Sequence, residues 1–193
     1  MFLFFETIKI KNSKIYNLKY HNHRVNRTIS EVFSKKSNLN LKEYIKLPKD
    51  ETLYKCKLTY STKIENITLE PYKMKRFKNF ICIESDIQYP YKSVNREEFE
   101  KLTELNKEYD EIIIIKDNLL TDTTIANIAL YNGLKWFTPK TPLLEGTLRA
   151  SLIEQKLLKT KDLDKKALKS CVKIAIMNAI IGFYELKDIK IRY

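Results

Sequence analysis

The stretch LLTDTTIANIALYNGLKWFTPKTPLLEGTLR, residues Leu119–Arg149, combines a hairpin with the start of a helix. The apolar run Ile125–Tyr131 predicts a strand, and the Asn132-Gly133 pair after it favours a tight turn. We expect the return strand to stop at Thr138-Pro139. A helix is then predicted from Leu148 to Leu157, after a short loop.

Gly146 stands just before this predicted helix. The first N–H groups of a helix have no partner within the helix and can bind a phosphate. Thr147 and Leu148 would supply these groups. Every helix start offers them, so an ordinary loop entering a helix is the more frequent meaning of this pattern taken alone.

The identities of the residues in this stretch are more specific than its hydrophobic pattern. It resembles the C-terminal half of the class IV aminotransferase family, the fold-type-IV enzymes that use pyridoxal phosphate (PLP). The matching segments, in family order, are Thr121-Asp122 with Asn127, Thr138-Pro139, Leu143-Leu144 with Gly146 and Arg149, and Asn178-Ala179. The resemblance implies an α/β (α+β) protein of two domains, similar to D-amino acid aminotransferase, with PLP between them.

The N-terminal part of the chain resembles the same family. Family members have an FET segment, a hairpin and then H-x-x-R-[LV], and this chain has Phe5-Glu6-Thr7, His21 and Arg24. The resemblance implies that Arg24 binds the PLP phosphate. A planar guanidinium suits that role because it can donate two parallel hydrogen bonds.

Lys92 is the candidate for the lysine that binds PLP covalently. A lysine ahead of a helix is nearly always an ordinary surface residue. In the family, however, the reactive lysine follows the interdomain connection in a K-x-x-[ND]-R-like context, which Lys92-Ser93-Val94-Asn95-Arg96 matches. The resemblance therefore implies that Lys92 is the catalytic residue, provided that its amine can lose a proton.

Further cofactor contacts are implied by position. Asp122 stands where many family members have a glutamate that keeps the PLP ring nitrogen protonated, and its side chain is one methylene shorter. Asn127 either contacts the cofactor or orients the loop. Gly146, Thr147 and Leu148, together with Asn178 and Ala179, would hold the phosphate through backbone and side-chain groups.

Composition narrows the partners. Lys and Arg number 36 against 24 Asp and Glu, a net charge of +12, but the lysines are scattered along the chain. No basic run or RNA-binding signature occurs, so we expect no nucleic-acid partner, and the positive charge suits a small anionic amino substrate instead. Three widely spaced cysteines predict reduced thiols, a cytoplasmic location and no metal site. No segment predicts a signal peptide or a membrane span.

Two domains are predicted, a small α/β domain over residues 1–86 and a C-terminal α/β domain over residues 87–193 that carries Lys92. Three strands, near residues 53–62, 64–71 and 77–84, would form an antiparallel sheet in the first domain. Lys55 and Lys57 share one side of the first of these strands. They either lie on a solvated face, the more frequent case, or meet a substrate carboxylate.

The resemblance leaves three functions open. Phe5-Glu6-Thr7 is more typical of the lyase-type members, which convert 4-amino-4-deoxychorismate to 4-aminobenzoate and pyruvate for folate synthesis. A transaminase acting on branched-chain or D-amino acids is the alternative, because shared PLP machinery does not decide the reaction. The third is a truncated, non-catalytic member. The resemblance also implies a homodimer.

Overall fold

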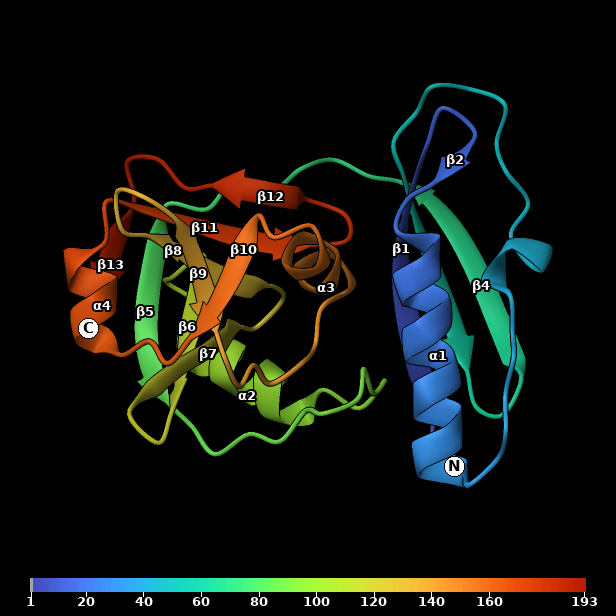
Figure 1. Ribbon diagram of the computed structural model, residues 1–193, viewed down its shortest axis with the longest axis horizontal. Helices are drawn as coiled ribbons and strands as arrows, with labels where there is room; N and C mark the ends of the chain where they lie inside the picture. The colour runs from blue at the N-terminus through green and yellow to red at the C-terminus, as the bar shows by residue number, and fades with distance from the viewer. Residues whose placement is uncertain (1) are drawn as a thin grey trace. The chain divides into compact units, whose positions relative to one another are not determined.

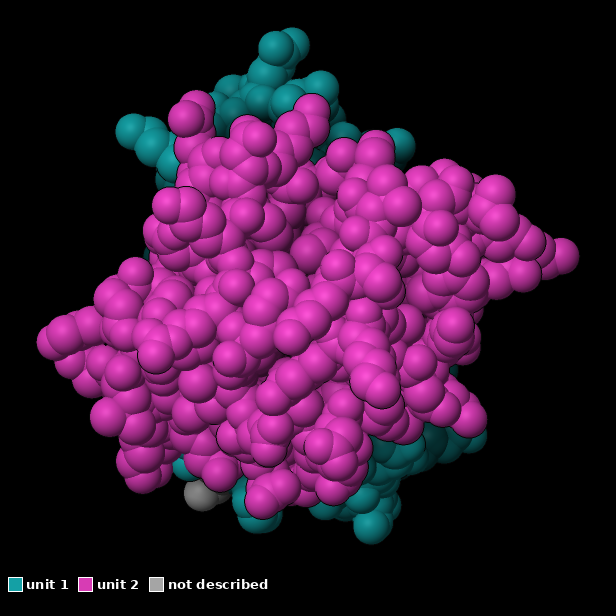
Figure 2. Space-filling view, turned by 90° about the vertical axis from the view of Figure 1, so that its left-hand side faces the viewer, with its two compact units in different colours: residues 1–74, 91–95 teal, residues 75–90, 96–193 magenta. Residues whose placement is uncertain are grey.

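The computed structural model describes residues 2–193 and divides into two compact units. Unit 1 comprises residues up to 74 together with 91–95, and unit 2 comprises residues 75–90 and 96–193. Figure 2 colours them teal and magenta. Among the described residues, no helix is long and apolar enough to cross a membrane.

Unit 1 is an antiparallel sheet with one long helix. Its elements are β1 (Phe4–Lys11), β2 (Lys14–Ile15), α1 (Leu18–Phe33), the 3-10 turn η1 (Leu41–Glu43), β3 (Tyr54–Tyr60) and β4 (Ile64–Pro71). The strand order is β2-β1-β3-β4. Helix α1 runs along the sheet (Figure 1).

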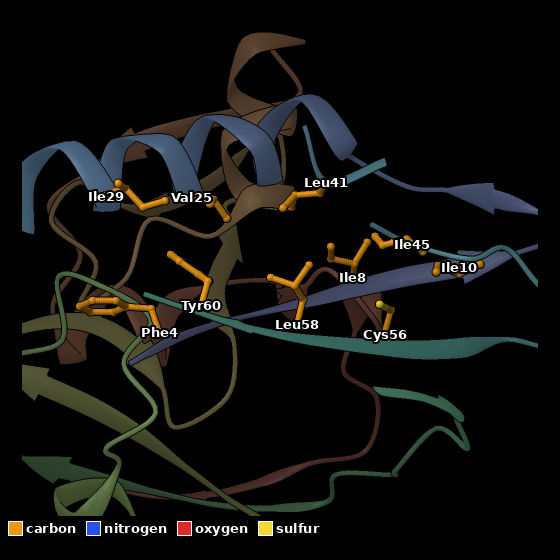
Figure 3. Packing of buried hydrophobic residues seen from close by; sticks show 10 residues of the cluster. All are labelled: Phe4, Ile8, Ile10, Val25, Ile29, Leu41, Ile45, Cys56, Leu58 and Tyr60. Carbon is orange, nitrogen blue, oxygen red and sulfur yellow. The ribbon is translucent and has the colours of Figure 1, made fainter. Parts of the chain in front are cut away.

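Alternation along the strands explains why this sheet has one apolar face. In β1 every second residue is buried, beginning with Phe4, and the residues between them are half-buried or exposed. Figure 3 shows side chains from β1 and β3 meeting Val25 and Ile29 of α1. The opposite face therefore carries the alternate set, which includes Phe5, Thr7 and Lys57.

Unit 2 is built on a larger mixed sheet. Its strands are β5 (Asn79–Glu84), β6 (Glu111–Lys116), β7 (Leu119–Thr123), β8 (Asn127–Tyr131), β9 (Trp136–Pro139), β10 (Leu158–Lys161), β11 (Lys173–Asn178), β12 (Gly182–Glu185) and β13 (Lys190–Arg192). Its helices are α2 (Glu97–Leu105), α3 (Thr147–Glu154) and α4 (Lys165–Ser170).

The strand order in this sheet is β10-β9-β8-β7-β6-β5-β13, and β11 pairs in addition with both β8 and β12. Strand β6 is buried along nearly its whole length because its run of isoleucines is covered on both faces. Strands β7 and β8 are joined through the single pair Asp122 and Asn127. The sheet thus brings two of the predicted site residues together.

The division into units differs from the predicted boundary after residue 86. Strand β5 was expected in the N-terminal antiparallel sheet, but it pairs in parallel with β6 and β13 of unit 2. Residues 91–95 return to unit 1, where Ser93 bridges to Phe4 and Val94 N–H donates to Leu3. Lys92 accordingly belongs to unit 1 and not to the C-terminal domain. Backbone pairing between distant segments decided both points, and local sequence patterns do not specify such pairing.

The predicted hairpin is present, but its tight turn is wrong, because Tyr131 pairs with Trp136 and the loop spans residues 132–135. Strands β8 and β9 flank a turn in which Gly133 has φ of 95°, a left-handed value that favours glycine. The helix after it begins at Thr147 but ends at Glu154, earlier than predicted. Residues Leu158–Lys161, for which no element was predicted, form β10, which pairs in parallel with β9.

Candidate active site

Lys92 lies beside the first strand of unit 1. Its carbonyl oxygen accepts a hydrogen bond from Phe5 N–H at 2.9 Å. Its Nζ lies 4.4 Å from the centre of the Phe5 ring, close enough for a cation–π interaction. The backbone bond and the ring contact together hold this half-buried lysine side chain against the face of the sheet that α1 does not cover.

Glu6, the next residue of β1, faces α1 and is fully buried. One carboxylate oxygen accepts from Arg24 Nε at 2.8 Å, and the other lies 2.6 Å from Arg24 Nη2. His21 Nδ1 lies 2.5 Å from that second oxygen. Because His21 and Arg24 are three residues apart on α1, they lie on the same face of the helix and reach the same carboxylate.

Charge pairing decides the protonation of this cluster. Burial alone would raise the pKa of Glu6, but the charge of Arg24 and the hydrogen bonds from His21 and Arg24 lower it to about 2. Burial lowers the pKa of His21 below its ordinary value, Glu6 opposes this, and the charges of Arg24 and Lys92 add to the lowering. Glu6 is therefore ionised and paired with Arg24 at neutral pH.

Arg24, the predicted phosphate ligand, is thus a buried residue whose charge is balanced by Glu6. The fixed orientation of its guanidinium suits a binding role, but the local net charge is smaller than that of an unpaired arginine. Its contact with phosphate stays a prediction. Sequence reasoning noted Glu6 and His21 as matches to a motif and missed that they form an ion-paired cluster with Arg24. The H-x-x-R spacing could have predicted this cluster, because it places the His21 and Arg24 side chains on one face of the helix.

Two predicted residues of unit 2, Asp122 and Asn127, contact each other, and both are buried. Asp122 Oδ1 accepts from Asn127 Nδ2 at 2.6 Å, and its Oδ2 accepts from Leu144 N–H at 2.9 Å. Asn127 Nδ2 also donates to Leu144 O at 2.8 Å. Asn127 therefore ties the loop before α3 to strands β7 and β8, and its contact with a cofactor stays a prediction.

Gly146 allows that close approach. A Cβ at this position would overlap Oδ1 of Asn127. Its φ of −66° is available to any residue, so the requirement for glycine here arises from space alone. The glycine predicted from the sequence as a phosphate site thus also has a packing reason.

Burial raises the pKa of Asp122 to about 6, although the hydrogen bonds from Asn127 and Leu144 and the charge of Arg149 oppose the rise. Arg149 is itself buried, and its Nη2 donates to Pro139 O at 2.8 Å. Sequence reasoning used Arg149 only as part of a motif. In the structure it is the cation whose charge acts on Asp122.

The other predicted phosphate contacts lie at two turns of unit 2. Thr147 and Leu148 form the first turn of α3, whose N-cap, Gly146, has no side chain to bond the N–H groups. Asn178 ends β11, and its Oδ1 accepts from the N–H groups of Ile180 and Ile181. The turn at Ala179 is thereby held by Asn178, whose side-chain oxygen is already engaged.

The two candidate substrate lysines of β3 differ. Lys55 pairs with Glu70 of β4, with 3.1 Å between Nζ and the carboxylate oxygen. Lys57 instead lies over the Phe5 ring, 5.3 Å from its centre. The strand register places Thr7 and Thr68 beside Lys57, so neither neighbouring strand offers it a carboxylate at that position.

Comparison with known proteins identifies the family. The family model for amino-transferase class IV matches residues 3–189, nearly the whole chain. The chain belongs to the class IV amino-transferase family. An uncharacterised protein of Haemophilus influenzae is 33% identical over 189 residues, which cover 94% of this chain and all of that protein.

Solved structures of other proteins have the same fold. A protein of Haemophilus somnus, provisionally described as a 4-amino-4-deoxychorismate lyase, is 30% identical with a TM-score of 0.87, over 94% of this chain and 98% of that one. A hypothetical aminotransferase of Mycobacterium tuberculosis, solved with PLP bound, is 12% identical with a TM-score of 0.79, over 97% and 81%. The α/β fold expected from the resemblance is thus confirmed.

The residues of this member of the class IV amino-transferase family fit a PLP cofactor in their chemistry. Lys92 presents an amine on an aromatic ring, α3 begins without a side-chain cap, and Asp122 is a buried carboxylate. One point differs from expectation, because both oxygens of Asp122 already accept hydrogen bonds from the protein. Since each carboxylate oxygen can accept two bonds, this does not prevent a further contact.

Proposed function

We propose that this protein is a PLP-dependent lyase that converts 4-amino-4-deoxychorismate to 4-aminobenzoate and pyruvate. The observation that carries the proposal is the 30% identity with the Haemophilus somnus protein over almost the full length of both chains. The Phe5-Glu6-Thr7 segment, typical of the lyase-type members, supports the same choice. In this proposal, the residues that act on the cofactor are Lys92, Arg24 and Asp122.

PLP, when bound, supplies an electron sink for the bond changes at the substrate carbon. Lys92 Nζ would form the covalent bond to the cofactor and, once displaced by the substrate amine, would accept and return a proton. Phe5 keeps that nitrogen in place through the ring contact and the bond to the Lys92 carbonyl. Arg24, held by Glu6, and the N–H groups of Thr147 and Leu148 would bind phosphate.

Asp122 would stabilise a proton on the cofactor ring nitrogen. With a pKa of about 6, it is mostly ionised at neutral pH and can carry the negative charge that such a contact needs. Asn127 and Leu144 N–H would hold it in one orientation throughout.

The covalent step is tested first. Purified protein mixed with PLP should turn yellow, and borohydride reduction followed by peptide mass spectrometry should find the label on Lys92. Lys92→Ala should bind no PLP covalently, whereas Lys107→Ala, which removes an exposed lysine on the surface of unit 2, should behave as wild type. A wild-type protein that stays colourless would refute the proposal and favour a non-catalytic family member.

The reaction is tested next. Pyruvate and 4-aminobenzoate should appear when the yellow protein receives 4-amino-4-deoxychorismate. Exchange of amino groups between keto acids and branched-chain or D-amino acids, without release of pyruvate from aminodeoxychorismate, would instead assign the protein as a transaminase.

We further propose a cytoplasmic homodimer acting on a small anionic amino substrate. The family resemblance supports the dimer, and the three cysteines, all unpaired in the structure, agree with a reducing compartment. Light scattering after size exclusion should give twice the 23.0 kDa of one chain. A monomeric mass at micromolar concentration would refute the dimer.

A further inference from the structure

Two lysines from different segments of unit 1 meet on one aromatic ring. Nζ of Lys92 lies 4.4 Å from the centre of the Phe5 ring, and Nζ of Lys57 lies 5.3 Å from the same centre. Lys92 comes from the returning segment 91–95 and Lys57 from β3. Three separate pieces of chain therefore place two positive charges around Phe5.

Strand geometry keeps this group on the face of the sheet opposite α1. Glu6 and Leu58 point toward the helix and are buried, so their neighbours Phe5 and Lys57 point the other way. The register places Thr7 directly beside Lys57 in β1 and Thr68 beside it in β4. Lys57 is consequently flanked by neutral hydroxyl side chains and is exposed to solvent.

Lys55, on the same strand, has its positive charge neutralised by a carboxylate of the protein itself. It occupies the next position on this face, and Glu70 pairs with it at 3.1 Å. Within residues 2–193, no carboxylate forms an ion pair of this kind with Lys57. The Phe5 ring attracts the Lys57 ammonium but carries no net charge, so it does not neutralise the positive charge of Lys57. An anion bound beside the ring would neutralise it.

We propose that Lys57 binds a carboxylate of the substrate next to the amine of Lys92, and that it selects substrates with an anionic group close to the reacting amine. This inference rests on the proposed function, since it gives Lys92 the covalent role. Lys57 Nζ donates to the carboxylate, while Thr7 and Thr68 leave the ammonium uncompensated until the ligand arrives. No bond is made or broken by Lys57.

The test compares three variants of the holoenzyme. Lys57→Gln should raise KM for the anionic substrate about tenfold or more, the usual effect of losing a hydrogen bond to a charged group, and should change kcat little. Lys57→Arg keeps the charge and should recover most of the loss. Lys63→Gln removes an exposed lysine of the same unit and should match wild type.

A binding readout separates this inference from the proposed function. Titration of the protein without PLP by calorimetry should give binding of glutarate, a dicarboxylate, but not of neutral glutaramide. Lys57→Gln should weaken glutarate binding about tenfold, and Lys63→Gln should not. If wild-type protein never binds PLP, the proposed function fails while this titration still tests Lys57.

Equal effects of Lys57→Gln and Lys63→Gln on glutarate binding and on KM would overturn the inference, as would the absence of glutarate binding in the wild type. A loss confined to kcat would also overturn it, because a residue that only binds the carboxylate changes the affinity. Circular dichroism of each variant would exclude misfolding, since Lys57 is exposed and replaceable without disturbing the core.

Discussion

Unit 1 buries the carboxylate of Glu6, unit 2 buries the carboxylate of Asp122, and the pKa values of the two shift in opposite directions. Glu6 in unit 1 has its pKa lowered to about 2, and Asp122 in unit 2 has its pKa raised to about 6. Burial raises the pKa in both cases. The difference is that Arg24 donates to Glu6 through two nitrogens, whereas Asp122 is held by the neutral donors Asn127 and Leu144 N–H.

Direct pairing with a cation therefore decides the outcome, more than depth in the protein. Arg149 acts on Asp122 by charge alone, since its Nη2 donates to Pro139 O. Unit 1 thus holds a permanent ion pair, and unit 2 holds a carboxylate that can take up a proton close to physiological pH. The second property suits a group meant to stabilise a proton on a bound molecule.

Glu6→Gln should have the largest effect on stability. It leaves the buried guanidinium of Arg24 without a counter-charge, which costs about 3–5 kcal/mol of unfolding free energy. Urea denaturation followed by circular dichroism measures the loss. Glu70→Gln, which breaks the exposed pair with Lys55, should cost at most about 1 kcal/mol. Equal losses would mean that Glu6 is not an essential partner of Arg24.

The pH dependence of stability should separate the two acids. The pKa of Glu6 is lower in the folded state, so its contribution is present above about pH 4.5 and is lost as pH falls toward about 2. The pKa of Asp122 is raised from 3.8 to about 6, so its contribution to stability falls as pH rises between those values.

Denaturation of wild type and Asp122→Asn at several pH values tests the expected pH dependence of the Asp122 contribution to stability. The wild type should lose about 2 kcal/mol relative to the variant as pH rises from about 4 to 6. A constant difference between the two proteins across this range would show that Asp122 has an ordinary pKa.

Gly146→Ala probes the packing around Asp122. The added methyl would overlap Oδ1 of Asn127, and overpacking of this kind costs about 1–3 kcal/mol. The double variant Asn127→Ala with Gly146→Ala should lose less than the sum of the two single changes, since removing the amide makes room. Strict additivity in thermal or urea denaturation would contradict the contact.

Asp164→Ala gives a reference value for the stability lost with a half-buried carboxylate that accepts from a backbone N–H. Its oxygen caps α4 by accepting from Ala167 N–H at 2.8 Å. Removing a cap of this type costs about 1 kcal/mol. A loss as large as that of Glu6→Gln would show that hydrogen bonds from neutral donors alone account for the strength of the Glu6 cluster.

The hairpin and the isoleucine strand β6 could be predicted because their signals are local. An Asn-Gly pair between two apolar runs favours a reversal of the chain, and an uninterrupted apolar run must be covered on both faces. Strand β10 could not be predicted, because its sequence LKTK is short and mostly polar, and only its pairing with β9 makes it a strand. The sheet to which β5 belongs could not be predicted either, because its partners β6 and β13 lie far along the chain.

The sequence by itself determined the family and named Lys92, Arg24 and Asp122, because motif order and spacing survive without coordinates. Only the tertiary structure decided that Arg24 is paired with Glu6, that Lys57 and not Lys55 shares a ring with Lys92, and that residues 91–95 belong to unit 1. Charge balance and burial depend on which side chains meet in space. The sequence alone does not give the distances between side chains that are far apart along the chain.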